Sequence, residues 1–247
     1  MLKKSILLEN KASLSTKNLQ LVIKTETRES SIPIEDIGYL VIDHPEIYLS
    51  IPAMNLIVEN KTSIIICNTN HLPNGMFLNL NSHHIQQEIF KNQINASVPL
   101  KKQLWQQTII EKITNQGILL QNITAKTNNF EFLASKVISG DSSNMEGVAA
   151  NFYWKVFFEQ KFKRERFGDY PNNFLNYGYA ILRAATARAL SGSGLLNTLG
   201  IHHKSKYNAF ALADDIMEPF RPIIDEKVSE IMQNYSEQEL NTAIKAE

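Results

Sequence analysis

The first 80 residues carry short apolar runs separated by polar breaks, which is the pattern of β-strands. The runs are SILLEN, LQLVIKT, SSIPIEDIGYLVID, YLSIPAMNLIVEN and TSIIICN. LQLVIKTET alternates apolar and polar positions, as a half-buried strand does, whereas SIIICN is apolar throughout, as a strand covered on both faces would be. We therefore expect a small sheet or a sandwich in this part of the chain.

One segment of this region has helical rather than strand spacing. Its apolar positions are Ile51, Met54, Ile57 and Val58, which predicts a short helix between residues 50 and 60. The segment Pro73–Gly75 then gives a strong turn signal before the pattern changes.

From about residue 85 onward apolar residues recur three and four positions apart, which indicates helices. One such series comprises Leu104, Ile109, Ile110 and Ile113, and a second comprises Phe130, Leu133, Ala134 and Val137. The chain is thus expected to be an α+β protein. A β-rich, sandwich-like domain over residues 1–84 would precede a larger all-helical domain over residues 85–247.

Composition narrows the class of protein. The 25 basic and 25 acidic residues give a net charge of zero, so DNA binding through overall basicity is excluded and any basic groups that bind DNA must cluster on one face. The single cysteine, Cys67, cannot form an internal disulfide and is interpreted as a core residue. No apolar run reaches the ~18 residues of a membrane span. The start, MLKKSILLENKASLS, lacks the apolar region of a signal peptide. We expect a cytoplasmic protein that is not associated with a membrane.

A carboxylate stands at the start of a predicted helix in SGDSSNMEGVAANFYWKVFFEQ. Ser143 and Glu146 fit the capping box, with Ser143 as the N-cap, and Glu146 could also serve as a metal ligand. Gly147 in the first turn costs up to ~1 kcal/mol of helix propensity. We interpret it as a place where a DNA strand or another helix approaches the backbone closely.

The densest basic cluster follows this helix, in QKFKRERF. It comprises Lys161, Lys163, Arg164 and Arg166. These residues suit either a solvated helix end or contact with a phosphate backbone, and the sequence leaves both interpretations open.

The stretch GIHHKSKYNAFALADDIMEPFRP, residues 200–222, concentrates histidines, carboxylates and cations. Histidine together with carboxylates suits a divalent cation, and neighbouring cations suit a phosphate-bearing substrate. The alternative is a polar loop followed by a helix with a solvated acidic turn. Composition does not choose between the two.

Helical spacing places three carboxylates, Asp214, Asp215 and Glu218, on one face of the predicted helix in this stretch. Such like charges need a divalent cation or basic partners, for which Lys204, Lys206 and Arg221 are candidates. Pro219 removes a backbone donor, so the helix is expected to kink or restart beside Glu218.

Three motifs together resemble the family of CRISPR-associated integrases of spacer acquisition, the Cas-one family, and most closely its type II members. They are NMEGVAANFYW, LNYGYAILRAATARAL and LGIHHKSKYNAFALADDIMEPFRP. The order of parts, β-rich and then helical, is also similar. The resemblance extends over almost the whole chain.

The resemblance implies a catalytic metal site made of Glu146, His203 and Glu218. It implies Mg²⁺ or Mn²⁺ as the cofactor. Asp214 and Asp215 would be neighbours of the metal or alternative ligands, because other branches place their aspartate there, and the adjacent His202 is likewise a neighbour or an alternative to His203. Candidate DNA contacts are Lys161, Lys163, Arg164, Arg166, Lys204, Lys206 and Arg221.

The implied activity is integration of short prespacer DNA into a CRISPR repeat array, by attack of a 3′-hydroxyl on a phosphodiester. The resemblance also implies a homodimer formed through the β domain, and assembly with the companion protein Cas-two. The family continues in helices beyond the proline motif, so we expect a C-terminally shortened helical domain. The alternatives are a non-catalytic DNA-binding scaffold subunit and a simple nuclease that acts on branched DNA.

Overall fold

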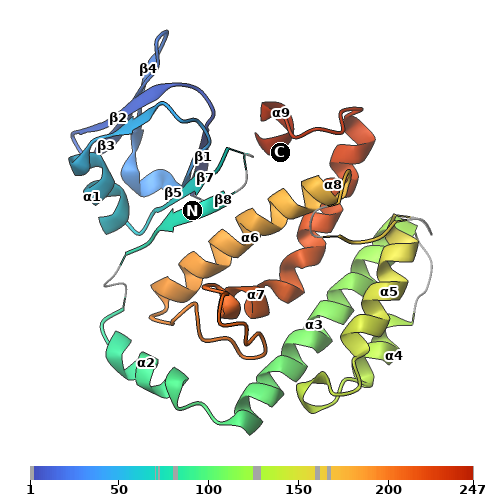
Figure 1. The fold of residues 1–247 in the computed structure, drawn as a ribbon. Helices are drawn as coiled ribbons and strands as arrows, with labels where there is room; N and C mark the ends of the chain where they lie inside the picture. Colours follow the sequence, from blue (N-terminus) through green and yellow to red (C-terminus); the bar gives the residue numbers. More distant parts are fainter. Residues whose placement is uncertain are drawn as a thin grey trace. The chain divides into compact units, whose positions relative to one another are not determined.

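The computed structural model describes residues 3–69, 71, 73–79, 83–124, 129–158, 162–165 and 168–246. It divides into two compact units (Figure 1). The β unit takes in residues 1–86 with a short piece at 191–194, and the helical unit takes in 87–190 and 195–245. None of the helices among the described residues is long and apolar enough to span a membrane.

Two four-stranded sheets make up the β unit. In the first, with the order β1-β5-β7-β8, the strands β1, β5 and β7 run parallel and β8 is antiparallel. In the second, with the order β4-β3-β2-β6, the strands β4, β3 and β2 are antiparallel neighbours and β6 pairs parallel with β2. The strands are β1 (Lys4–Leu8), β2 (Ala12–Lys17), β3 (Gln20–Lys24), β4 (Glu29–Pro33), β5 (Ile37–Ile42), β6 (Ile47–Leu49), β7 (Ser63–Cys67) and β8 (Pro73–Phe77).

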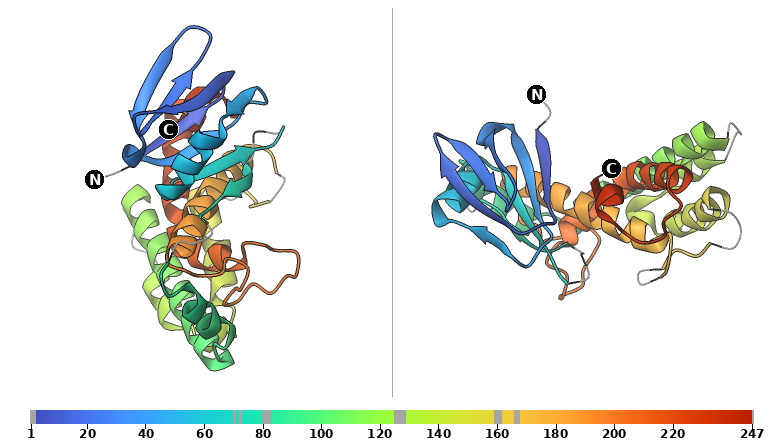
Figure 2. Two further views of the ribbon diagram at one scale, coloured as in Figure 1. Left: turned by 90° about the vertical axis from the view of Figure 1, so that its left-hand side faces the viewer. Right: turned by 90° about the horizontal axis from the view of Figure 1, so that it is seen from above.

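A single apolar core joins the two sheets of the β unit. Leu14 and Leu21 come from the second sheet, whereas Leu40 and Ile64 come from the first. All four are at most 1% exposed. Two sheets that share one core form a sandwich-like arrangement, and Figure 2 shows both sheets from two further sides.

The predicted helix within the β unit is confirmed as α1 (Ile51–Glu59). Its N-cap is Ser50, whose side chain accepts a hydrogen bond from the N–H of Ala53. Ala53 and Ile57 are fully buried in the shared core, so this helix packs against the core with one face.

Two strands differ from the sequence prediction. The turn expected at Pro73–Gly75 is instead the start of β8, which pairs with β7 on one side only. Proline is compatible with the first position of such an edge strand because its missing N–H breaks no ladder bond there. Strand β2 was not predicted, because only Ala12 and Leu14 in its polar sequence ASLSTK are buried.

The helical unit is organised around α3 (Val98–Thr124), which contacts α4, α5, α7 and α8 (Figure 1). The predicted apolar positions Ile109 and Ile113 are fully buried, but Leu104 is exposed and Trp105 is buried in its place. The other helices are α2 (Gln86–Ile94), α4 (Phe130–Ser135), α5 (Met145–Phe157), α6 (Asn172–Gly192), α7 (Ala211–Met217), α8 (Arg221–Asn234) and α9 (Thr242–Ala246), with the 3₁₀ turns η2 (Ser139–Asp141) and η3 (Glu218–Phe220). A further 3₁₀ turn, η1 (Ile34–Asp36), lies in the β unit.

Candidate active site

Glu146 lies in the first turn of α5, but the predicted capping box is wrong. Asp141, not Ser143, caps this helix: its carboxylate oxygens accept the backbone N–H of Met145 at 2.9 Å and of Glu146 at 3.0 Å. The Ser143 hydroxyl instead donates to the carbonyl of Lys136. The Glu146 carboxylate accepts a hydrogen bond from outside its own helix, from Lys112 of α3.

The glycine after Glu146 lies against a side chain of its own chain. Asn144 precedes the helix with a left-handed backbone (φ 53°). A Cβ atom at Gly147 would lie 2.8 Å from the Asn144 side-chain nitrogen. The close approach that the sequence indicated at this position is therefore that of the Asn144 side chain.

Lys112 of α3 joins the two glutamates that the sequence assigns to the metal. Its Nζ atom lies 2.6 Å from Glu146 Oε1 and 2.6 Å from Glu218 Oε2. The Lys112 and Glu218 side chains are 11% and 6% exposed, and that of Glu146 is 31% exposed. Two carboxylates from different helices thus share one largely buried ammonium group.

These charges determine how the buried groups titrate. Burial by itself would raise the pKa of Glu218, but Lys112 and Arg221 outweigh burial and hold its pKa below the ordinary value. Burial would likewise lower the pKa of Lys112, yet Glu218 and Glu146 together hold the pKa of this lysine above its ordinary value. At neutral pH Glu218 and Lys112 therefore both carry their charges.

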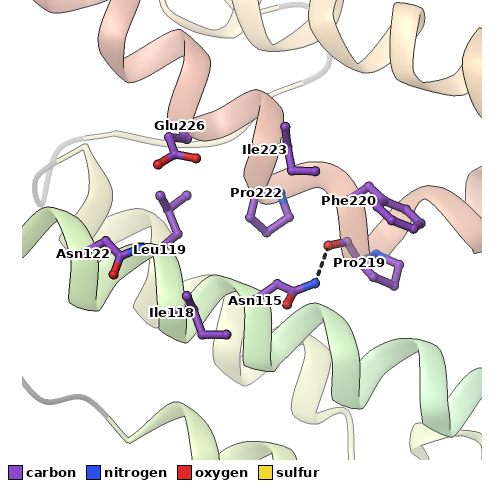
Figure 3. Close-up of a pocket in the computed structure, with 9 residues that line it drawn as sticks. All are labelled: Asn115, Ile118, Leu119, Asn122, Pro219, Phe220, Pro222, Ile223 and Glu226. Atoms are coloured by element: carbon purple, nitrogen blue, oxygen red, sulfur yellow. Dashed lines mark hydrogen bonds between the residues drawn. The ribbon is translucent and has the colours of Figure 1, made fainter. Parts of the chain in front are cut away.

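The chain restarts at Glu218, as Pro219 predicts. Helix α7 ends at Met217, the turn η3 follows, and α8 begins at Arg221. The Pro219 carbonyl accepts a hydrogen bond from the Asn115 side chain of α3 at 2.8 Å (Figure 3). Arg221 pairs with the other oxygen of Glu218 at 2.9 Å. The Glu218 carboxylate is thus held between a lysine and an arginine.

The pocket drawn in Figure 3 lies beside this turn, between α3 and the start of α8. Its lining is mainly apolar and includes Ile118, Leu119 and Ile223. Neither Glu146 nor Glu218 lines it. The candidate site is therefore the charged cluster and not this pocket.

His203 is held by the buried carboxylate of Asp215. The Nδ1 atom of His203 lies 2.5 Å from Asp215 Oδ1, and Asp215 also accepts the backbone N–H groups of Ile201, His202 and His203. The hydrogen bond with Asp215 raises the pKa of His203, with smaller contributions from Asp214 and Glu218. Because a carboxylate only accepts, Nδ1 carries the proton and Nε2 is left for a metal or a proton.

The neighbouring His202 has a different environment. Its ring stacks on Trp105 of α3, with ring centroids 4.2 Å apart and an angle of 5° between the planes. His203 meets the same indole edge-on, at 6.1 Å. The two histidines therefore differ in environment: His202 stacks on an indole, whereas the Asp215 carboxylate orients His203.

The alternative of a solvated acidic turn in this stretch is wrong. Asp214, Asp215 and Glu218 are 6%, 0% and 4% exposed. Asp214 accepts from Arg183 Nε at 2.6 Å and from the Asn208 amide at 2.8 Å. Each of the three carboxylates has its own partners, so Asp214 and Asp215 position the loop and the histidine rather than forming one open acidic surface.

Among the predicted DNA contacts, the described residues include an arginine that is bonded within the protein and lysines that are exposed. Lys161 and Arg166 lie outside the described residues. Arg164 bonds the side chains of Asn172 and Asn176, at 2.9 and 2.6 Å, and so fastens its segment to α6. The exposed side chains are those of Lys163, which pairs with Glu165, and of Lys204 and Lys206.

Sequence reasoning missed Lys112, Asp141 and a buried carboxylate, Asp225. Asp225 accepts the hydroxyls of Tyr153 (2.8 Å) and Tyr179. Lys112 did carry a signal, because it follows the buried Ile109 by three positions on the inward face of α3. A lysine at an apolar position of a helix is a buried cation that needs partners.

The carboxylates of Glu146 and Glu218 and the imidazole of His203 suit a divalent cation once the Lys112 side chain moves away from the two glutamates. Among the residues that the structure describes, no three histidine or carboxylate groups already converge on one point. Lys112 stands between the two glutamates, and Glu218 Oε2 is buried without a directed hydrogen bond although the ammonium is close. Carboxylate oxygens with one imidazole nitrogen suit Mn²⁺ and, with waters, Mg²⁺.

The described residues therefore form an α+β protein whose helical unit holds an acidic pair together with an oriented histidine. The chain belongs to the family of CRISPR associated protein Cas1, the Cas-one family that the motifs indicate, because that family's model matches residues 6–242. A curated relative, the CRISPR-associated endonuclease Cas1 of Neisseria meningitidis serogroup C (strain 8013), is 39% identical over 226 residues, which are 90% of this chain and 73% of the relative.

Solved structures have the same fold. A casposase bound to integration product matches with a TM-score of 0.81 and 20% identity, over 98% of this chain and 77% of that one. A Cas6-RT-Cas1–Cas2 complex matches with a TM-score of 0.70 and 22% identity, over 94% of this chain and 28% of that one.

Proposed function

We propose that the protein is a type II-like Cas1 integrase, which inserts short prespacer DNA into a CRISPR repeat array with the help of a divalent cation. The observation that carries this proposal is the meeting of Glu146 and Glu218 at one point of the helical unit, in a family whose curated relatives are named endonucleases. The type II assignment is supported by the DIMEPFRP motif with Glu218.

Glu146, Glu218 and Nε2 of His203 would hold the cation. Asp215 would keep the imidazole in the tautomer that leaves Nε2 unprotonated. Bound Mg²⁺ or Mn²⁺ would polarise the target phosphodiester and stabilise charge on the leaving oxygen.

The reaction is a transesterification. The 3′-hydroxyl of the incoming strand attacks the phosphorus of a phosphodiester at the border of the repeat. A new P–O bond forms as the old one breaks; the attacking hydroxyl gives up its proton and the leaving 3′-oxygen takes one up. The number of phosphodiesters stays constant, so neither ATP nor a covalent enzyme intermediate is needed.

Exposed cations of the loop after His203 and of the segment before α6 are the proposed contacts to DNA. Lys204 and Lys206 follow His203 directly in the loop, and Lys163 lies in the basic segment before α6. Arg221 is committed to Glu218 and acts mainly on that carboxylate. We further propose a homodimer formed through the β unit and assembly with Cas2, the protein found with Cas1 in one structural neighbour.

Strand transfer of labelled DNA into a repeat-bearing plasmid, with Mg²⁺ or Mn²⁺, tests the proposal. The wild type should join the DNA, whereas Glu146→Gln, Glu218→Gln and His203→Ala should lower joining by at least roughly a hundredfold, a loss comparable to that of other catalytic groups. The exposed Lys155→Met on α5 is the matched control and should keep wild-type joining.

The assay also separates the two alternatives. A scaffold subunit would bind DNA without any metal-dependent chemistry. A simple nuclease would cut flaps or junctions without joining ends. Joining at the wild-type rate by Glu146→Gln or His203→Ala would overturn the assignment of the site.

A further inference from the structure

Lys112 is a buried cation placed where the proposed function needs a metal. Its ammonium is the shared partner of Glu146 and Glu218, at 2.6 Å from each. The side chain reaches this point from α3, and its neighbours three and four positions away on that helix face, Ile109 and Gln116, are 0% and 4% exposed. The lysine therefore has a fixed place in the core and is not a surface residue that happens to lie nearby.

The carboxylate pair depends on this ammonium. Glu218 is 4% exposed, and two carboxylates brought together out of water repel one another unless a cation lies between them. Arg221 pairs with Glu218 at 2.9 Å but no ion pair joins it to Glu146 among the described residues. Lys112 is thus the group that holds the two helix-borne carboxylates at one place.

The contact to Glu218 is close but poorly directed. Oε2 of Glu218 lies beside the ammonium, yet it is buried and receives no directed hydrogen bond. An ammonium binds only through its three N–H donors, whereas a divalent cation is bound directly by carboxylate oxygens. The place between the two carboxylates therefore suits a cation.

We propose that Lys112 is a positioning residue, the internal counter-ion that keeps Glu146 and Glu218 converged before metal binds and that the divalent cation displaces. This inference rests on the proposed metal site. The long flexible side chain of lysine can move aside without any change in its helix. Lys112 thereby lowers the metal affinity of the site while keeping the site assembled.

Metal binding by the full chain tests the displacement. Mn²⁺ dissociation constants are measured by isothermal titration and by electron paramagnetic resonance of free Mn²⁺. The variant Lys112→Met keeps an unbranched side chain, one atom shorter and without the charge, and Lys155→Met is the exposed control. Removing the competing charge should tighten Mn²⁺ binding by roughly tenfold or more, and the control should bind as the wild type does. Equal or weaker binding by folded Lys112→Met overturns the proposal.

A second measurement uses the wild-type chain, so it does not depend on the folding of a variant. Lysines are acetylated briefly with and without Mn²⁺, and the Lys112 peptide is quantified by mass spectrometry. Displacement should increase modification of Lys112 severalfold, while modification of Lys155 stays constant. Unchanged modification of Lys112 at saturating Mn²⁺ contradicts displacement.

The variant Glu218→Gln distinguishes the failure of this inference from failure of the metal site. If Glu218→Gln weakens Mn²⁺ binding but Lys112→Met leaves it unchanged, the metal site stands and the role of Lys112 is overturned. If Glu218→Gln binds Mn²⁺ as the wild type does, the metal site and the role of Lys112 are both overturned.

Discussion

His203 Nδ1 lies 2.5 Å from Asp215 Oδ1, and Asp215 is fully buried. The same carboxylate accepts the backbone N–H groups of three successive residues of the loop. One side chain therefore fixes both the path of the loop and the proton position on the imidazole. This combination explains why a motif with two adjacent histidines yields one oriented ring.

We expect Asp215→Asn to lower the free energy of unfolding by about 3 kcal/mol, because an amide nitrogen would replace a charged acceptor facing buried donors. Urea denaturation measures this change. The exposed Glu111→Gln of α3 is the control and should stay within about 0.5 kcal/mol of the wild type. A similarly small change for Asp215→Asn would show that Asp215 does not hold the loop.

The two histidines should respond oppositely to substitution. His202→Phe keeps a flat ring that can stack on Trp105. The rate of strand transfer should therefore stay within about twofold of the wild-type rate, because the aromatic contact is kept. His203→Phe removes the nitrogen proposed as a ligand and should abolish Mn²⁺-dependent strand transfer. Parallel plasmid-joining assays compare them, and loss of joining by a folded His202→Phe would reverse the assignment.

The cap of α5 offers a stability test with an internal control. Asp141→Ala removes the acceptor for two backbone N–H groups and should destabilise the protein by about 1–2 kcal/mol, the usual cost of a lost cap. Ser143→Ala should change stability by no more than about 0.5 kcal/mol. Guanidinium denaturation of both variants gives the comparison, and equal losses would restore the capping box that the sequence indicated.

Asp225 should make stability depend on pH. Burial raises the pKa of Asp225 from 3.8 to about 6, although the hydroxyls of Tyr153 and Tyr179 act in the opposite direction. The folded protein therefore binds this proton more tightly than the unfolded chain does. The resulting stabilisation is complete below pH 3.8 and is lost as the pH rises through about 6.

Asp225→Asn stays neutral and lacks this loss. From pH 4 to pH 7.5 its free energy of unfolding should shift relative to that of the wild type, in favour of the variant, by up to about 3 kcal/mol. Urea unfolding at several pH values measures the difference between the two proteins. The exposed Asp169→Asn is the control. A constant difference between Asp225→Asn and the wild type across this range would contradict the raised pKa.

Local patterns predicted the elements where one face of a segment is consistently apolar. The helix α1 and the restart at Glu218 follow from spacing and from Pro219, both of which act within a few residues. The capping box failed because a competing acceptor, Asp141, lies two residues before Ser143 and reaches the same donors through a turn. Strand β2 was missed because its sequence is largely polar.

The sequence by itself identified the side chains that are suited to a metal site, because motifs such as GIHHKSKYN and DIMEPFRP contain such residues at short spacings. Only the tertiary structure decided how these groups pair. Helices α3, α5 and η3 bring Lys112, Glu146 and Glu218 together from distant parts of the chain, and packing buries them in a medium where each charge must find a partner. The lysine between the two glutamates follows from that burial, which no local pattern contains.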